Sequence, residues 1–370
     1  MAALEFMPEA QNNNTGSQPE RARPAKVSDT YRIRQGDAQT DRKDILRLWR
    51  FLPGTNPPQA EKLDWFYRNR PAGDGVFYFL DYLPEDRPVA VVCLGRREFS
   101  IAGNRHQGVV FGDFAVEPKH RSLGPAVFFQ KGFLKLAREQ FDLVFGFPNE
   151  LSGKVRAFGG YKLDMQVATY VRPLDFTQYL RRHAPTPVAL LAGTLLNGVF
   201  AIALKREHAQ ARRQFSRVDV SSSFLDQLWA RVEQQGVAMG VRNAAFFEWR
   251  LMRHPGKQFH SVTIVDAAQQ PAGYLAYEIN DDGVLVVADH LAINRDALGA
   301  LLSFAVAQRP KGSRAISISE PAADSALATW LKTKRFSLRS EFSCFLSKSE
   351  SLAALTDVDV IRLNFSDNDV

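Results

Sequence analysis

The sequence has little cysteine, with only Cys93 and Cys344 in 370 residues. Both lie in apolar, strand-like runs, and neither has a partner at metal-ligand or CxxC spacing. The chain also lacks GxGxxG, GxxxxGK[ST] and GxSxG motifs. These absences argue against metal, dinucleotide, P-loop and serine-hydrolase sites. We expect two reduced core cysteines in a cytoplasmic protein.

The composition is that of a folded protein long enough for two domains, with 45% hydrophobic and 24% charged residues. A net charge of +7 favours an anionic partner without identifying it. Nucleic acid is not expected, because the basic segments lack interleaved aromatic residues. Residues 1–30 are rich in Asn, Gln, Pro and charge and have no apolar signal segment, so we expect a disordered lead-in.

Hydrophobic periodicity is clear between residues 31 and 175. A strand, two helices and three strands are followed by a helix over 123–141, a buried strand over 141–148, a short helix and a closing strand over 161–173. The order β-α-α-β-β-β-α-β-α-β predicts an α/β (α+β) domain with a mixed sheet flanked by helices.

The chain also repeats itself. Residues 63–73 align with 247–257, which matches Trp65 to Trp249 and Pro71 to Pro255, and later segments match Asp113 to Asp289 and Gly124 to Gly299. Several matches in the same order indicate a duplicated unit. We therefore expect a lead-in over residues 1–30, a first domain over 31–175 and linker helices over 176–217. A related second domain over 218–346 and a C-terminal tail over 347–370 would follow.

Residues 185–204 carry no charge and are flanked by Arg181, Arg182, Lys205 and Arg206. The stretch has the length of a membrane span, about 20 residues. Asn197 and Gly198 interrupt it. Two interpretations stay open: a helix that contacts a membrane surface, which would make the protein membrane-associated, and a helix packed between the two domains.

The chemically informative segment is residues 109–126, a strand, a polar turn and the start of a helix. Such a junction directs backbone N–H groups and the positive end of the helix dipole to one place, which suits a pyrophosphate. Gly124 allows close approach of the backbone. Pro125 has no N–H, although its fixed φ favours the start of a helix.

Residues 121–126, Arg-Ser-Leu-Gly-Pro-Ala, fit the acyl-CoA motif of the GNAT superfamily, [Arg or Gln]-x-x-Gly-x-[Gly or Ala]. The order of elements over 31–175 resembles that fold as well, so the repeat implies two tandem GNAT-like domains. By resemblance, backbone groups of Phe114 to Val116 would hold pantetheine, and other residues would hold the phosphates or line the site. The implied cofactor residues are Phe114, Ala115, Val116, Arg121, Ser122, Leu123, Gly124, Pro125, Ala126 and Asn149, with the amides of Leu123, Gly124 and Ala126 on the pyrophosphate and Lys119 and His120 adding charge.

Catalytic residues are harder to assign from the sequence. Asp113 and Glu117 flank the expected site, but Asp113 has a counterpart in Asp289, so a structural role is about as plausible as a catalytic one. Tyr170 on the closing strand is a candidate for protonating the leaving thiol by resemblance only, and Tyr161 is better explained as packing. The second copy has the shorter NRDALGA in place of EPKHRSLGPA, which predicts a degenerate domain. His290 is interpreted as a core residue.

The resemblance implies an acyl-CoA-dependent N-acyltransferase that moves an acyl group from acetyl-CoA or another acyl-CoA to an amine by direct attack, without a metal. The acceptor would be a small molecule or a lipid- or sugar-linked amine, and the oligomeric state stays open. Two alternatives remain. One is a Fem-type tandem transferase that uses aminoacyl groups on peptidoglycan or lipid acceptors, and the other is a non-catalytic acyl-CoA-binding module.

Overall fold

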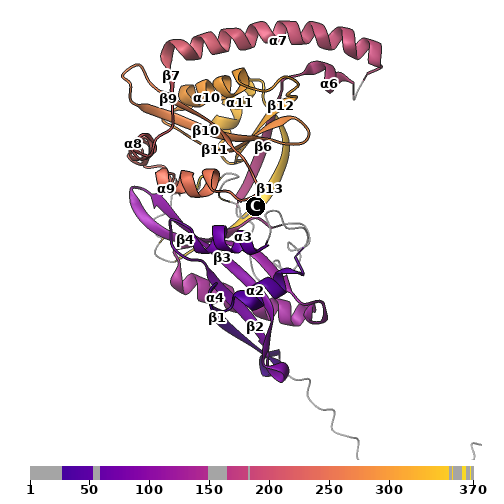
Figure 1. Ribbon diagram of the computed structural model, residues 1–370, viewed down its shortest axis with the longest axis vertical. Coiled ribbons are helices and arrows are strands. Elements are labelled where there is room, and N and C mark those ends of the chain that lie inside the picture. Colours follow the sequence, from indigo (N-terminus) through magenta and orange to yellow (C-terminus); the bar gives the residue numbers. More distant parts are fainter. Residues whose placement is uncertain are drawn as a thin grey trace, which may run out of the picture.

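The computed structural model describes residues 27–52, 59–148, 165–181, 184–349, 352, 361–363 and 367. Two halves follow one another along the long axis of the molecule (Figure 1). Each half is a twisted, mostly antiparallel sheet with helices against it, and the two sheets form one continuous 13-stranded sheet. The α/β architecture with two related halves agrees with the expectation from the sequence.

The first half contains the strands and helices expected for residues 31–148. Its elements are α1 (Val27–Thr30), β1 (Tyr31–Gly36), α2 (Arg42–Trp49), α3 (Gln59–Lys62), η1 (Leu63–Arg68), β2 (Val76–Tyr82), η2 (Leu83–Glu85), β3 (Arg87–Ile101), β4 (Asn104–Val116), η3 (Pro118–His120), α4 (Leu123–Gln140) and β5 (Leu143–Gly146). Helix α4 buries Phe129, Phe133 and Ala137 against the sheet because these residues recur at helical spacing.

The second half repeats this plan after two connecting helices. Its elements are β6 (Met165–Pro173), α6 (Phe176–Leu180), α7 (Thr186–Gln214), β7 (Ser216–Val218), α8 (Ser222–Glu233), β8 (Met239–Gly240), α9 (Ala244–Phe247), η4 (Glu248–Met252), β9 (His260–Val265), β10 (Pro271–Ile279), β11 (Val284–Ala292), α10 (Arg295–Ala307), β12 (Ala315–Pro321), α11 (Ser325–Thr333) and β13 (Ser337–Lys348). Cys93 and Cys344 are both buried and unbonded to each other.

The two halves exchange their last strands. The strand expected to close the first half, β6, forms as predicted, but it pairs with β12 of the second half. Strand β13 of the second half in turn pairs with β5 of the first through Phe345–Lys348, and with β6 through Ser337–Cys344. Periodicity predicts that a strand forms but not which sheet it joins. The sheet boundary therefore does not follow the expected division at residue 175.

The internal repeat seen in the sequence is a pseudo-two-fold symmetry in space. Trp65 and Trp249 lie in corresponding π-helical turns, η1 and η4. The Nε1–H of each indole donates to the backbone carbonyl of the other, both at 2.8 Å. The rings are buried and stacked with their centroids 5.8 Å apart. This reciprocal contact joins the halves beside the exchanged strands.

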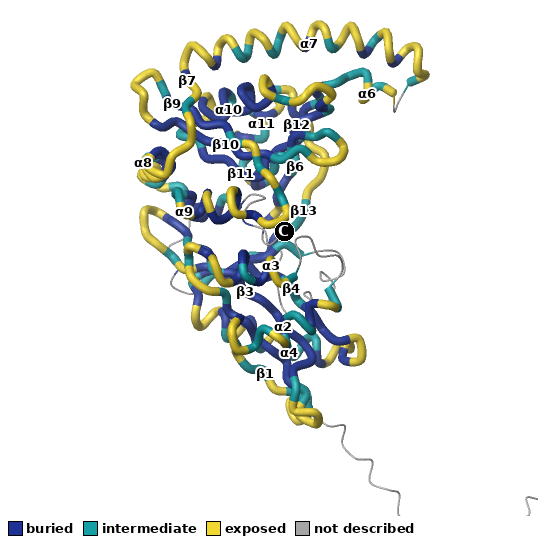
Figure 2. The backbone as a smooth tube through the Cα atoms, viewed as in Figure 1, coloured by how far each residue is buried: buried dark blue, intermediate teal, exposed yellow. Residues whose placement is uncertain are grey.

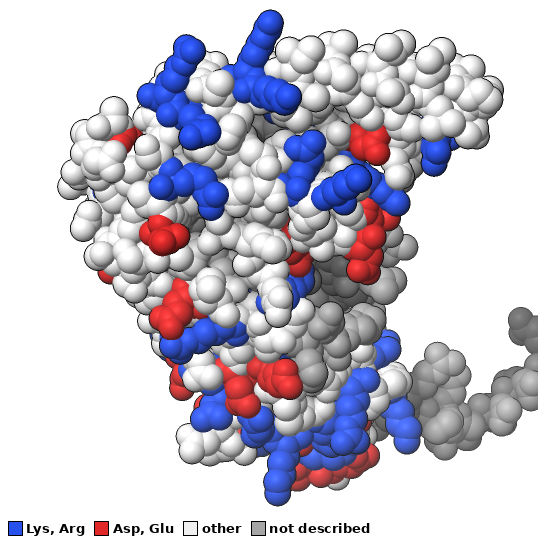
Figure 3. All heavy atoms as spheres, turned by 45° about the horizontal axis from the view of Figure 1, so that its top comes forward, with Lys and Arg blue, Asp and Glu red and all other residues white. Residues whose placement is uncertain are grey.

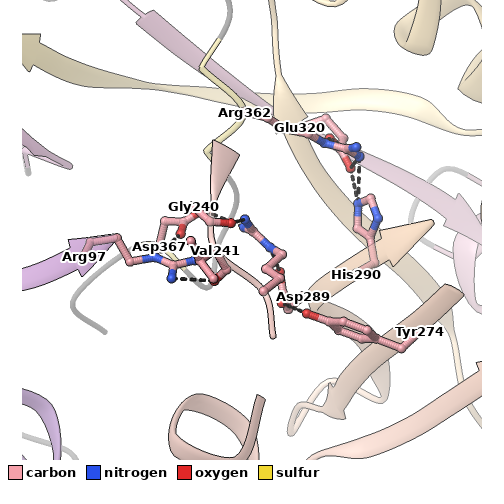
Figure 4. A network of polar contacts seen from close by, with 10 residues as sticks. Arg97, Gly240, Val241, Tyr274, Asp289, His290, Glu320, Arg362 and Asp367 are labelled. Carbon is pink, nitrogen blue, oxygen red and sulfur yellow. Dashed lines mark hydrogen bonds and ion pairs between the residues drawn. The ribbon is translucent and has the colours of Figure 1, made fainter. Parts of the chain in front are cut away.

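The C-terminal segment, expected to be a tail, contributes buried residues between the halves. Ile361, Leu363 and Asp367 are at most 3% exposed. The Asp367 carboxylate accepts from Arg97 of the first half (3.0 Å) and from Arg242 of the second (2.7 Å), as Figure 4 shows. The alternating apolar residues 361 and 363 fill the core, so a tail from 347 onward was the wrong prediction for these positions.

A second polar cluster in Figure 4 contains the buried His290 and Glu320 and the partly buried Arg362. The Glu320 carboxylate bonds the His290 ring and accepts from Arg362 at 3.2 Å. Burial by itself raises the pKa of Glu320, but the charges of Arg362 and His290 outweigh that effect and lower the pKa to about 2. His290 is thus a buried, hydrogen-bonded residue, in keeping with a core role.

We expect Trp65→Phe to lower the free energy of unfolding by about 1–3 kcal/mol, because the Trp249 carbonyl loses its donor while it stays buried. The matched control is Trp229→Phe: Trp229 is also buried, but its Nε1 has no hydrogen-bond partner in the described structure. Chemical unfolding measures both variants. Equal losses would contradict a specific role for the reciprocal indole contact.

The Glu320 cluster predicts a pH dependence of stability. The folded pKa of about 2 lies below the ordinary value of 4.5, so the ionised carboxylate stabilises the folded state above pH 4.5 and this contribution is lost as the pH falls toward 2. Glu320→Gln should remove up to about 3 kcal/mol at pH 7 and flatten the acid limb of the stability curve. Glu341→Gln, at an exposed carboxylate, is the control. If Glu320→Gln leaves the pH dependence of stability unchanged, the Glu320 carboxylate is not its origin.

Candidate functional site

Strands β4 and β5 separate partway along the first half. Their parallel pairing includes only Gly108–Val110 and Leu143–Phe145. Strand β4 continues to Val116, with a bulge opposite Val91–Cys93 and a left-handed backbone at Asp113 (φ 44°). Within the described residues no strand pairs with Phe114, Ala115 or Val116 on the side that faces β5. This edge can accept an extended group as an additional strand.

The start of α4 lies directly beyond this edge. Ser122 precedes the helix without a side-chain capping bond, and the first turn has no acidic residue. The amides of Leu123 and Gly124 have no acceptor among the described residues, as is usual for the first turn of a helix. Together with the helix dipole they form an open anion-binding position.

Two residues of the motif contribute less to that position than expected. The Ala126 amide donates to the Ser122 carbonyl at 3.2 Å, so the helix itself uses it. Pro125 is the third helical residue; its ring is buried and it has no N–H. The open amides are therefore those of Leu123 and Gly124.

The cations near the loop also differ from expectation. Arg121 donates to the carbonyls of Val116 (3.0 Å) and Phe51 (3.1 Å), so it holds the turn in place. His120 points inward and its Nδ1 bonds the Tyr31 hydroxyl at 2.9 Å. Lys119 is exposed. The prediction that His120 faces the phosphates was wrong, because its ring packs between Tyr31 and Tyr82.

The end of the expected lead-in is ordered beside this site. Residues 27–30 form α1, which contacts α4 and β1, so the lead-in prediction was wrong for these four residues. The Val27 side chain lies 3.4 Å from the place where a Cβ on Gly124 would be. Gly124 is exposed, and a small side chain there would touch α1 without a backbone clash.

Asp113 is held by two partners that the sequence did not reveal. Its carboxylate pairs with Lys62 at 2.9 Å and accepts from the Tyr67 hydroxyl at 2.7 Å. The counterpart Asp289 has the same kind of partners, Arg242 at 2.9 Å and Tyr274 at 2.5 Å. A tyrosine and a cation on the repeated aspartate favour a structural role, fixing the bulge, over proton transfer.

Glu117 is likewise neutralised. It is buried and bonds Arg47 and Arg87, the latter at 2.6 Å. Burial alone raises the pKa of Glu117, but hydrogen bonds from both guanidinium groups outweigh burial and lower the pKa below its ordinary value. A carboxylate with a lowered pKa is a weak base, so this geometry does not favour Glu117 as a proton acceptor.

The remaining candidates are not brought to the opening. Tyr170 lies on β6 between β12 and β13, in the core of the second half. Burial and nearby carboxylates raise its pKa. The strand exchange therefore separates Tyr170 from the first-half site. Asn149 and Tyr161 lie outside the described residues, and no group of three potential metal ligands occurs in the described part of the chain.

The second half keeps the frame of this site but not its open amides. Strand β11 has a bulge opposite Ala276–Tyr277 and pairs with β12 through only three residues. A cavity of about 360 Å³ borders the start of α10. However, Asn294 caps that helix by accepting from the Ala297 amide at 2.8 Å, and Asp296 lies in its first turn. Both features disfavour a bound phosphate.

The structure also corrects one match of the repeat. Gly124 is the second residue of α4, whereas Gly299 is the fifth residue of α10 and lies against Trp330. The second residue of α10 is Asp296. An acidic residue therefore occupies the position that corresponds to the exposed glycine of the first half.

One protein family matches part of this sequence. Residues 238–342 match the family described as the acetyltransferase (GNAT) domain. The match falls on the second half, so it reports the fold of that half and not the open amides of the first. No curated protein matches the chain.

Solved structures resemble most of the chain at low identity. A probable N-acyltransferase from Enterococcus faecalis has a TM-score of 0.60 at 14% identity, over 86% of this chain and 72% of that one. GCN5-related N-acetyltransferases from Anabaena variabilis and Kribbella flavida have TM-scores of 0.57 and 0.55 at 14% and 13% identity, over 85% and 87% of this chain and 72% of each of theirs.

The sequence match and the structural likenesses agree with the mixed α/β architecture described above. Residues 238–342 thus form a GNAT domain, and both halves have a GNAT-like fold similar to that of the solved N-acetyltransferases.

Proposed function

We propose that the protein is an acyl-CoA-dependent N-acyltransferase whose cofactor binds in the first half alone. The observation that supports this proposal most strongly is the pair of open amides at Leu123 and Gly124, next to the unpaired edge of β4. The amides would bind the pyrophosphate of acetyl-CoA or another acyl-CoA. Phe114, Ala115 and Val116 would bind the pantetheine arm through their backbone.

The reaction would be direct attack of an amine on the thioester carbonyl. The C–N bond forms, the C–S bond breaks, the amine loses a proton and the thiolate of CoA leaves. The protein orients the two substrates, which lowers the entropic part of the barrier. Because Asp113 and Glu117 are paired with cations, we expect the amine to reach the carbonyl unprotonated or to lose its proton to water.

One observation favours a second candidate function. Both described carboxylates beside the opening are neutralised by cations, as they would be in a module that binds acyl-CoA without turnover. Release of CoA thiol in the presence of a panel of small-molecule, sugar-linked and lipid-linked amines distinguishes the two. An enzyme releases thiol with at least one amine, whereas a binding module releases none above the uncatalysed rate.

We further propose a cytoplasmic location, for which the support is that Cys93 and Cys344 are buried and form no disulfide.

The cofactor site is tested by Gly124→Asp. This change gives α4 the acidic second residue that α10 already has, and it places a carboxylate where the pyrophosphate would bind. We expect acyl-CoA affinity to fall by at least about a hundredfold, because the carboxylate repels the phosphates of the cofactor. Stability should be kept, since an acidic residue is favourable in the first helical turn.

Two controls accompany this variant. Gly124→Ala adds only a Cβ, which has room beside Val27, and should bind within a few-fold of wild type. Asp296→Gly should create no second site, because Asn294 still caps α10. Calorimetry with CoA measures all three proteins. Unchanged affinity in folded Gly124→Asp would overturn the site assignment.

A further inference from the structure

Helix α7 exposes most of an apolar stretch. It is the one helix of the described chain that is long and apolar enough to cross a membrane, yet only 17% of its most apolar 18 residues are buried. It lies across the outer surface of the second half, on the side away from the first half (Figure 1). Figure 2 shows it as mostly exposed, with intermediate and buried residues recurring along its inner face.

The inner face of α7 is packed on the protein. Ala189, Gly193 and Phe200 are buried there, and a Cβ on Gly193 would lie 2.4 Å from the Thr177 backbone of α6. The Asn197 side chain accepts from the Phe176 amide at 2.8 Å and donates to Asp175 at 3.1 Å. Asn197 therefore faces inward, and Gly198 has no side chain. Neither residue places a polar side chain on the outer face of α7.

The outer face is apolar along the N-terminal part of α7. Val188, Leu191, Leu195, Val199 and Ile202 recur at helical spacing and are each 56–70% exposed. Soluble helices normally bury such a row. A membrane span would need apolar residues all around, whereas this helix has one face fixed to the protein by polar contacts, so it fits a helix lying in the plane of a membrane surface.

The same outer face becomes basic toward the C-terminal end. Arg206 and Arg213 continue the row at helical spacing, and Lys205 and Arg212 lie beside it, all exposed. The single acidic residue of α7, Glu207, is turned inward and paired with Arg172 at 2.9 Å. Figure 3 shows the resulting surface, with a long uncharged stretch and cations toward one end.

We propose that the outer face of α7 binds the surface of an anionic phospholipid bilayer. The apolar row would enter the boundary between headgroups and acyl chains, and the cations would contact the headgroup phosphates. A second copy of the chain is a poorer partner, because pairing of two such faces would leave the exposed cations of both copies without acidic partners.

The proposal does not depend on the proposed transferase activity. Strand β4 and helix α4 lie in the other half, away from α7 (Figure 1). Binding through α7 would therefore locate the protein at a membrane without placing the first-half opening on the lipid. A soluble acceptor stays compatible with this arrangement.

Co-sedimentation of the full chain with lipid vesicles tests the proposal. Wild type should bind phosphatidylcholine vesicles that contain about one-third phosphatidylglycerol, and bind less as salt rises. Leu191→Gln with Leu195→Gln should lower the partition coefficient by at least about tenfold, because two side chains lose their apolar environment. Arg206→Gln with Arg213→Gln should weaken the preference for anionic over neutral vesicles, because two of the four exposed cations of this face are lost.

Met252→Gln is the matched control, because Met252 is 59% exposed on η4 and not on α7. It should bind vesicles as wild type does. Failure of wild type to bind anionic vesicles at low salt would overturn the proposal, as would undiminished binding of the double leucine variant. A dimer of wild type that the leucine variant loses, or unfolding of that variant by circular dichroism, would equally overturn it, because the face would then be a protein contact or core.

Discussion

The structure depends on the exchange of closing strands between its two halves. Strand β13 pairs with β5 at one end and with β6 along the rest, while β6 pairs with β12, so neither sheet is complete without a strand from the other half. The reciprocal bonds of Trp65 and Trp249 and the bridging carboxylate of Asp367 lie at the same junction. The halves therefore have a fixed relative position, and the core between them includes residues from the C-terminal segment.

Within this symmetric frame the two halves differ where chemistry would occur. Both keep a bulged strand, an aspartate held by a tyrosine and a cation, and a sheet that opens after three paired residues. The difference is at the following helix, where Gly124 leaves two amides open in α4, while Asn294 and Asp296 occupy the start of α10. A change of a few residues thus separates a half with an open anion-binding position from a half without one. The half without it is the one that the family model matches.

Local features were predictable from the sequence because they depend on neighbouring residues. The helix at 123–141 and the strands around it follow from periodicity, and the correspondence of Trp65 to Trp249 follows from repetition, whereas the contact between the two indoles does not. The exchange of strands could not be predicted, because the hydrophobic pattern of β6 is the same whichever sheet the strand joins. The partners of Asp113 and Glu117 come from distant segments and carry no spacing signal, although Tyr67 lies within the repeated stretch. His120 is a residue type that often binds phosphate. Only its contacts with Tyr31 and Tyr82 in the structure show that its side chain is buried in the core.

We propose that only one of the two related halves has kept a cofactor site. Calorimetric titration of the intact protein with CoA tests it most directly, because stoichiometry does not depend on knowing the acceptor. We expect one CoA per chain, bound by the half that contains Leu123 and Gly124. Two equivalent sites per chain would contradict it, because the capped and acidic start of α10 would then bind phosphate as well as the open start of α4 does.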